Sequence, residues 1–375
     1  MTLRVTIYRL GVIPLLLILC LLAACSAQEL EPDWGDRVNL KVLASATTRG
    51  EDGTAESLPD VEKNIYDLSV YIFDSNGKAI AFKSEKFDKD YSAPKSVNIS
   101  THRAAGCTLY VVANAIRLSA DGNTSPFKGV STLSDFKKLV LQFASVDKQA
   151  NPDCLLMVGR LAGFDTSSSS TKVALKRLAA KVTFNITVNS DKATSLPIKV
   201  DSYQLCHVPD QMLYQQDDFF YPSAGSSPAP SMPSGEINYR VYPPRTPKTA
   251  SPITYTCYVP ANSNTSDDSD DKVTYLKIKA HCQADENKPE SKVWESEFKI
   301  KLPKDKNSHF DSMVLPNYRY TLNITIQGSA SAAGGKITSY SAYPFFSGGN
   351  LEQWNDHWND DNNGQVKIDF DYYWN

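Results

Sequence analysis

The sequence predicts a mainly β protein with two tandem β-sandwich domains, of immunoglobulin-like or transthyretin-like type, and one short helix. The chain of 375 residues contains 19 Tyr and 15 Phe together with many Val, Ile and Thr, which are the residues that strands favour. Short segments in which apolar and polar side chains alternate recur along most of the chain. The length exceeds one ordinary core and fits two domains of about 100–200 residues. Periodicity leaves open which sandwich topology the domains adopt.

The N-terminus is typical of an export signal. Arg4 and Arg9 supply positive charge, Val12–Leu22 is almost wholly apolar, and two alanines lead into Cys25. The apolar run is shorter than the roughly 20 residues that span a bilayer. A cysteine directly after the small residues indicates a lipoprotein precursor, in which residues 1–24 are removed and Cys25 carries fatty acyl chains such as palmitate. An ordinary signal peptide with a chance cysteine is the alternative.

The first predicted strand is Arg37–Ala46, preceded by an acidic tether over residues 26–36. Its apolar side chains alternate with polar ones, as in a strand with one buried face. These apolar residues are Val38, Leu40, Val42 and Ala44. The charged stretch 47–53 should be exposed. Residues 25–50 therefore comprise a tether and a first strand ahead of an N-terminal sandwich.

The N-terminal sandwich is predicted over residues 51–172. Its strongest strand signal is Ile65–Asp74, and an Asn-Gly turn leads from it into Lys78–Phe82, which indicates a hairpin. Two more strands are expected at Lys95–Ser100 and Cys107–Asn114.

The one predicted helix is Ser131–Ala144. Ser131 or Ser134 could cap its start, and its apolar residues fall on one face. That face consists of Leu133, Phe136, Val140 and Phe143.

The C-terminal sandwich is predicted over residues 173–375. Alternating segments define its strands: Arg177–Val188, Pro197–Leu205, Ile253–Val259, Val273–Cys282, Val293–Leu302 and Tyr318–Gln327. Tyr221–Pro252 contains eight prolines and should be a long irregular loop. The chain ends in a last predicted strand whose apolar side has a period of two: Val366, Ile368, Phe370, Tyr372 and Trp374.

Composition and motifs argue against several classes of function. The net charge of -3 is spread over both signs, so nucleic acid is not an expected partner. The common nucleophile, phosphate-binding, zinc and dinucleotide motifs do not occur, and the five histidines are scattered. Residues 359–364 faintly resemble a calcium loop, but Phe370 stands where a glutamate should close the site. We expect no enzyme activity, no cofactor and no metal.

Five cysteines follow the signal region, at Cys107, Cys154, Cys206, Cys257 and Cys282. Their number is odd and no CxxC spacing occurs, so at least one is unpaired within the chain. Export allows a disulfide but a domain of this size does not require one. Buried, inert thiols are the expectation.

Aromatic side chains concentrate near the C-terminus around Trp354 and Trp358. If exposed, they could stack on sugar rings of a host glycan or contact a host protein. The simpler interpretation is that they fill a subunit interface or cover the core.

The order of these features resembles the fimbrillin superfamily of Bacteroidota, whose members build or anchor type V pili. The resemblance rests on the lipoprotein signal, the first strand, the hairpin VYIFDSNG, the segment RLAAKVTFNITV, Tyr258–Ala261 and Leu315–Gly328. It covers nearly all of the chain after the signal and depends on order and spacing.

The resemblance implies assembly by strand exchange between two-domain subunits. A lipidated precursor at the outer membrane is cut by an arginine-specific protease, here between Arg49 and Gly50. The cut removes the strand Arg37–Ala46 and opens a groove, which the donor strand Val366–Trp374 of another subunit, identical or related, then fills. The mature protein is located in a surface fimbria.

Two alternatives remain open on the sequence. Shaft, tip and anchor subunits share the fold, and an anchor keeps its lipid and first strand. The segment 354–363 and the Pro-rich loop also fit a surface lipoprotein that does not polymerise and binds a host glycan or protein.

Overall fold

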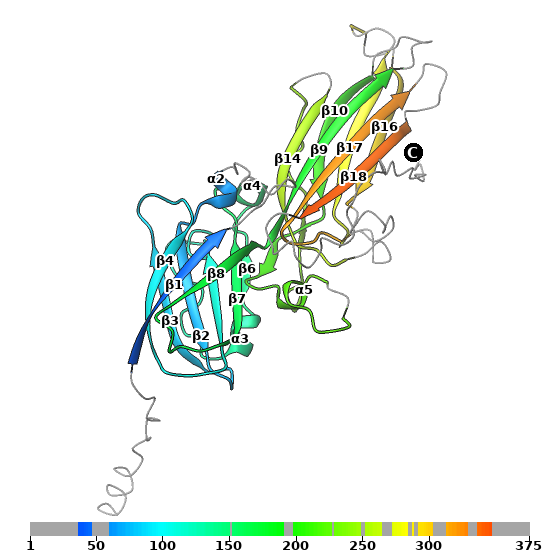
Figure 1. The fold of residues 1–375 in the computed structure, drawn as a ribbon. Helices are drawn as coiled ribbons and strands as arrows, with labels where there is room; N and C mark the ends of the chain where they lie inside the picture. Colours follow the sequence, from blue (N-terminus) through cyan, green and yellow to red (C-terminus); the bar gives the residue numbers. More distant parts are fainter. Residues whose placement is uncertain are drawn as a thin grey trace, which may run out of the picture.

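The computed structural model describes residues 37–46, 60–150, 152–190, 198–226, 229–248, 252–264, 272–283, 287–288, 292–302, 313–328 and 336–346. They form two β-rich halves joined by short connections (Figure 1). No helix within these ranges is long and apolar enough to cross a membrane.

The N-terminal half is one seven-stranded arrangement in the order β3-β2-β5-β7-β8-β1-β4. Its strands are β1 (Arg37–Ala46), β2 (Asp67–Phe73), β3 (Ala79–Lys86), β4 (Lys95–His102), β5 (Cys107–Ala113), β7 (Met157–Phe164) and β8 (Ser170–Arg177). The two ends of the order meet, because Nζ of Lys83 on β3 donates a hydrogen bond of 2.9 Å to the carbonyl oxygen of Asn98 on β4. The sheet therefore folds over onto itself as a sandwich around an aliphatic core.

β8 changes from one layer of this sandwich to the other. It pairs with β7 at two positions only, and farther along with β1. A Cβ added to Gly159 of β7 would lie 2.5 Å from the carbonyl oxygen of Ala174 on β8 and would also meet the Val173 side chain. Only glycine allows this close approach of the two backbones.

A third layer covers the outer face of β2 and β5. All seven residues of β2 are buried, because Leu68, Val70 and Ile72 face the sandwich core while Tyr71 and Phe73 face a second cluster. That cluster includes Phe127 and Phe136 of the connection after β5. The continuous apolar run of β2 thus corresponds to a strand buried on both faces.

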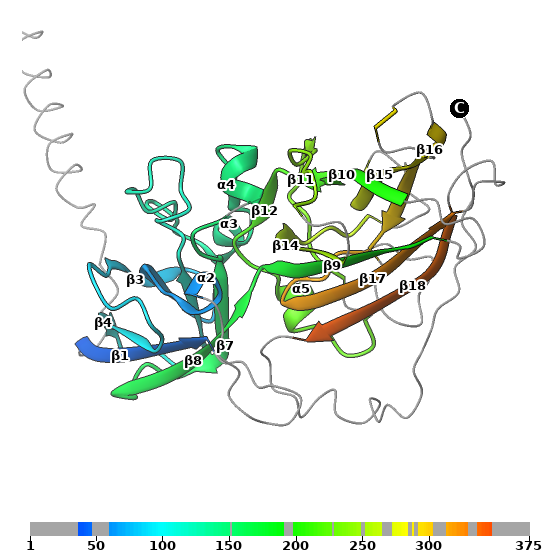
Figure 2. The ribbon, with the colours of Figure 1, turned by 90° about the horizontal axis from the view of Figure 1, so that it is seen from above.

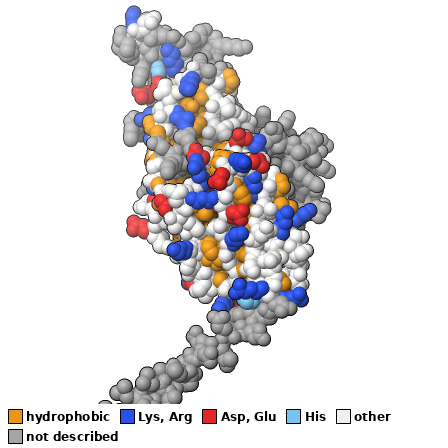
Figure 3. Space-filling model, turned by 90° about the vertical axis from the view of Figure 1, so that its left-hand side faces the viewer, with side chains coloured by type: hydrophobic (Ala, Val, Ile, Leu, Met, Phe, Trp, Pro, Cys, Tyr) orange, Lys and Arg blue, Asp and Glu red, His pale blue; other side chains and the backbone are white. Residues whose placement is uncertain are grey.

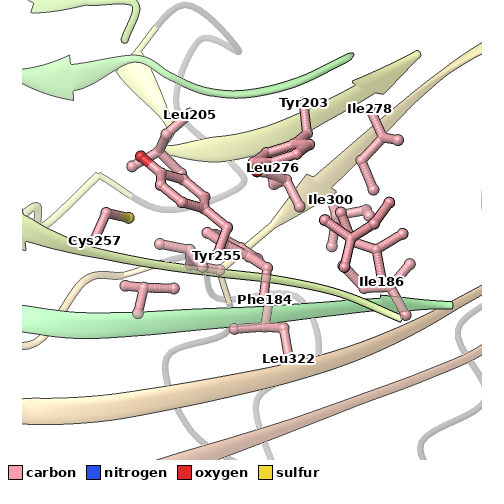
Figure 4. Packing of buried hydrophobic residues seen from close by; sticks show 14 of the residues in the cluster. Phe184, Ile186, Tyr203, Leu205, Tyr255, Cys257, Leu276, Ile278, Ile300 and Leu322 are labelled. Carbon is pink, nitrogen blue, oxygen red and sulfur yellow. The ribbon is translucent and has the colours of Figure 1, made fainter. Parts of the chain in front are cut away.

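The C-terminal half is a second sandwich. One sheet has the order β14-β9-β17-β18 and the other β10-β15-β16. Their bounds are β9 (Ala179–Ser190), β10 (Ile198–Cys206), β14 (Ile253–Pro260), β15 (Tyr275–Gln283), β16 (Lys292–Lys301), β17 (Tyr318–Gly328) and β18 (Lys336–Phe346). Side chains from both sheets, such as Phe184, Leu276 and Leu322, meet between them (Figure 4).

A segment between β10 and β14 returns to the N-terminal half. Here β12 (Gln211–Leu213) pairs with β6 (Val140–Gln142), and Met212 and Tyr214 enter the aromatic cluster behind β2. β11 (Val208–Pro209) pairs with β13 (Tyr239–Arg240), and α5 (Asp217–Phe220) lies between the halves. Most of the Pro-rich stretch is irregular, as the prolines predict.

The mainly β fold class is confirmed, and the strand beginning at Arg37 has the predicted bounds. The helix over Ser131–Ala144 is wrong in extent. α3 covers only Leu133–Lys137, and the side chain of Thr132, rather than Ser131 or Ser134, caps it. The remainder forms β6, because it pairs with a strand some 70 residues later.

The other helices are short: α2 (Asp60–Lys63), α4 (Val146–Ala150) and α5, so the described residues hold four helices rather than the one expected. The sequence patterns predict no strand at β7, β8 or β18. The change of sheet falls at Leu178, between β8 and β9, whereas the second set of strands predicted from the sequence places the domain boundary near residue 172.

Candidate functional site

The candidate site is the position that β1 occupies in the N-terminal sheet. β1 lies between β8, with which it runs parallel, and β4, with which it runs antiparallel (Figure 2). Its register with β4 extends from Arg37–His102 to Ala44–Lys95, and that with β8 from Lys41–Ser170 to Ala46–Leu175. Although β1 comes first in the chain, it is an inner strand of the sheet.

The inner face of β1 is part of the core. Leu40, Val42 and Ala44 are each 0 % exposed, whereas Val38 at the start of the strand is half-buried. The side chains around them come from the flanking strands and the opposite layer, including Val97, Ile99, Val173, Leu175 and Val70. These four residues of β1 are those that the sequence predicts for the removable strand.

Without β1, two features would be exposed together. The flanking strands β4 and β8 would each present unpaired backbone N–H and C=O groups along one edge, and the core beneath would be open to water. An added strand with alternating apolar side chains pairs the free backbone groups and covers the core at the same time. The position of β1 is therefore a candidate acceptor for a strand, and β1 itself occupies it in this structure.

Glu62 is a residue of this region that no sequence pattern singles out. It lies on α2, which follows β1 in the chain, and its carboxylate is 2 % exposed. One carboxylate oxygen lies 2.7 Å from Nζ of Lys181 and accepts a 2.8 Å hydrogen bond from the hydroxyl of Tyr258; the other lies 3.5 Å from Arg319. The guanidinium of Arg177 donates to the Glu62 carbonyl oxygen.

These contacts set the charge of Glu62. Burial acts to raise the pKa of its carboxyl, but the hydrogen bond and charge of Lys181, with Tyr258 and Arg177, outweigh burial and hold the pKa below its usual 4.5. Glu62 is therefore ionised, and it ties α2 to three strands of the second sandwich and to the end of β8.

A second polar contact joins the halves at α5. The buried carboxylate of Asp217 accepts a hydrogen bond from the hydroxyl of Tyr110 and lies 3.1 Å from Lys137 and 3.4 Å from Arg160. Burial, followed by the charge of Asp217, raises the pKa of Tyr110 well above its usual value, so this hydroxyl remains a donor. Both contacts fix the first sandwich against the segments that follow it.

The cysteines behave as expected where the structure describes them. Cys107, Cys154, Cys206 and Cys257 are buried free thiols. Burial raises the pKa of the Cys257 thiol to about 12, and that of Cys107 and Cys154 in the same direction. Such thiols are unreactive. Cys282 lies on β15, but its side chain is outside the described residues.

Several predicted site residues lie outside the described residues. They are Cys25, Arg49, Gly50, Trp354, Trp358 and the donor-strand residues Val366, Ile368, Phe370, Tyr372 and Trp374. In the described part of the chain, His, Cys, Asp and Glu form no group of three that could hold a metal ion.

The geometry defines a two-domain β-sandwich protein whose first strand completes the sheet of the first domain. Residues 37–200 match a family model described as "Major fimbrial subunit protein (FimA)". The match begins at the first residue of β1 and includes the acceptor sheet. It confirms the resemblance to the fimbrillin superfamily, a family of fimbrial structural proteins and not of enzymes.

Solved structures share this fold. A putative cell adhesion protein from Parabacteroides distasonis has a TM-score of 0.58 and 15% identity, with 82% of this chain and 97% of that chain covered. A fimbrilin from Porphyromonas gingivalis has a TM-score of 0.51 and 13% identity, covering 82% and 98%. The tip fimbrial protein Mfa3 of the same organism, with a C-terminal truncation, has a TM-score of 0.50 and 13% identity, with 83% of this chain and 100% of that chain covered. No curated protein matches the chain.

Proposed function

We propose that this chain is a structural subunit of a cell-surface fimbria that polymerises by donor-strand exchange. The observation that supports this most directly is the position of β1, an N-terminal strand that lies inside a sheet and buries three side chains completely. Removal of a strand from this position leaves a continuous groove between β4 and β8 that can accept another strand. The family match of residues 37–200 supports the fimbrial role.

The precursor is a lipoprotein at the outer membrane in this proposal. Cys25 carries the lipid, and an arginine-specific protease cuts between Arg49 and Gly50, three residues after the end of β1. The cut separates β1 and the lipid from the rest of the chain. Glu62 and α2 remain on the mature side of the cut, held at the second sandwich.

The donor is the C-terminal segment Val366–Trp374 of another subunit. Its alternating apolar residues match the alternation of β1, which is what a strand needs to close the same core. Because acceptor and donor lie at different places on each subunit, the contact is head-to-tail and yields filaments rather than closed rings.

Limited proteolysis of the purified precursor tests the proposal. Trypsin or an arginine-specific protease should make one early cut after Arg49, followed by SDS-resistant ladders. Arg49→Ala should remove both the cut and the ladder, whereas Arg103→Ala, an exposed arginine outside β1, should change neither. A folded precursor that is not cut at Arg49, or a cut protein that stays monomeric, would contradict the proposal.

Deletion of Val366–Asn375 tests the donor separately. The truncated chain should still be cut after Arg49 but should form no ladder by itself. Mixed with full-length cut protein, it should occupy one end of each filament, because it has an acceptor and no donor. An undiminished ladder would show that another segment is the donor.

A second candidate function rests on the aromatic residues Trp354 and Trp358. In this alternative the protein keeps its lipid and binds a host glycan or protein at the cell surface as an anchor or adhesin. A glycan array probed with the uncut precursor tests it, with Trp354→Ala and Trp358→Ala as the variants that should lose any signal.

A further inference from the structure

The resident strand β1 and the two strands that border it carry basic residues and no acidic ones. β1, β4 and β8 contain Arg, Lys and His but neither Asp nor Glu. On the face of the molecule that Figure 3 shows, by contrast, acidic and basic side chains are interspersed. These three strands therefore form a locally positive surface on a protein whose net charge is -3.

Three of these cations have partners. Lys95 of β4 lies 3.3 Å from the carboxylate of Asp90, and Arg177 at the end of β8 is buried against Glu62. Lys176 lies over the rings of Phe220 and Tyr221, at 4.9 Å and 4.8 Å from their centroids. Lys172 is exposed on the outer face of β8 and forms no ion pair with the residues that the structure describes.

Lys172 has a like-charged neighbour on β1. Lys41 pairs with Ser170 and Leu43 pairs with Lys172 in the parallel register, so Lys41 and Lys172 are diagonal neighbours on the same outer face. Diagonal positions on adjacent strands lie about 7–8 Å apart, which is within reach of two lysine side chains. Both are exposed, and like charges in this arrangement repel.

The candidate donor strand has the opposite charge at the matching place. Its central apolar residue, Phe370, lies between Asp369 and Asp371. In β1, Lys41 lies between Leu40 and Val42, the two largest fully buried side chains of that strand. When Phe370 takes the place of either Leu40 or Val42, one of the two aspartates takes the place of Lys41. This holds whichever direction the donor strand runs.

We propose that Lys172 selects the donor strand by charge: it repels Lys41 of the resident strand and pairs with Asp369 or Asp371 of a second copy of this chain. The proposal rests on the strand-exchange function proposed above and identifies what the acceptor recognises, which is an apolar strand with acidic residues on its outer face. Exchange of a cationic strand for an anionic one makes the occupied acceptor more stable than it was in the precursor.

A charge-swap cycle in the full chain tests the proposal. Lys172→Glu alone, and Asp369→Lys with Asp371→Lys, should each slow ladder formation about two- to fivefold at low salt. The three changes together should restore the rate to within about twofold, because the pair is reversed rather than removed. Lys128→Glu, an exposed lysine of the same domain outside the sheet, is the matched control and should have no effect. At about 1 M salt, where screening acts within ~3 Å, the differences should disappear.

A second measurement needs no polymerisation. In the uncut precursor, Lys41→Asp should pair β1 with Lys172 and raise the urea midpoint, and this gain should vanish when Lys172→Glu is added. If wild type forms no ladder, the strand-exchange function fails while this measurement still reports on the charge contact. Two results would contradict charge selection by Lys172 if wild type does form ladders. One is that Lys172→Glu assembles at the wild-type rate at low salt. The other is that the combined variant assembles no faster than Lys172→Glu alone or than the double aspartate variant alone.

Discussion

The carboxylate of Glu62 lies 2.7 Å from Nζ of Lys181 and joins the short helix after β1 to the first strand of the second sandwich. Arg177, Tyr258 and Arg319 surround the same residue. The first sandwich and the second sandwich are therefore held together by a charged centre that remains in the chain after the proposed cut at Arg49.

Replacement of Glu62 by Gln should lower the stability of the precursor. The variant leaves Lys181, Arg177 and Arg319 without their anion, and breaking a buried ion pair costs about 3 kcal/mol or more. Urea unfolding at pH 7 measures the change. Lys63→Gln is the matched control, because the pair of Lys63 with Asp60 is exposed and should contribute less than about 1 kcal/mol. Equal effects of the two variants would contradict a buried charged centre.

The same residue predicts a dependence on pH. Because the pKa of Glu62 is held below 4.5 in the folded chain, its ionised form stabilises the fold above about pH 4.5, and this stabilisation is lost as the pH falls through the lowered value. The gap in unfolding free energy between wild type and Glu62→Gln should therefore narrow from pH 6 toward pH 3. A difference in unfolding free energy that stays constant over this range would show that the charge of Glu62 does not stabilise the fold.

Leu40→Ala should destabilise the precursor but not the assembled subunit. Leu40 is fully buried in the core, and truncation of such a side chain costs about 2–5 kcal/mol. In the proposed filament β1 is absent, so the heat resistance of the ladder should equal that of wild type. Asn39→Ala, exposed on the same strand, serves as the control for the unfolding measurement. A ladder weakened by Leu40→Ala would mean that β1 stays in the fold.

Gly159→Ala should disturb the wall of the acceptor. The added methyl group would lie 2.5 Å from the carbonyl oxygen of Ala174, and overpacking of this kind costs about 1–3 kcal/mol. Since β8 borders the acceptor, the variant should lower both the stability of the precursor and the yield of ladders. Ala162→Ser, at an exposed position of β7, should leave both unchanged.

Tyr71 predicts a loss of stability in alkali. Burial raises its pKa to about 12, and its hydroxyl donates a 2.6 Å hydrogen bond to the carbonyl oxygen of Phe127. The unfolded chain ionises near pH 10, so the contribution of this protonated hydroxyl is complete below pH 10 and is lost as the pH rises toward 12. The urea midpoint of wild type should fall more between pH 9 and pH 11 than that of Tyr71→Phe. Parallel curves would contradict the prediction.

The strands with clear alternation could be predicted from the sequence because a period of two is a local property. Arg37–Ala46 shows it, and its bounds and buried face agree with the structure. The structure of the segment after Thr132 could not be predicted in the same way. Its apolar spacing fits a helix, but Val140–Gln142 pairs with Gln211–Leu213, and a partner so distant leaves no local pattern.

The sequence by itself determined the β fold class, the alternation of the first strand and the resemblance to fimbrial subunits. Only the tertiary structure decided that β1 is an inner strand between β8 and β4, that Glu62 is buried, and that Lys41 and Lys172 are neighbours. The physical reason is the same in each case. Alternation fixes which face a side chain occupies, whereas the neighbour on that face depends on the order and register of elements that lie far apart in the sequence.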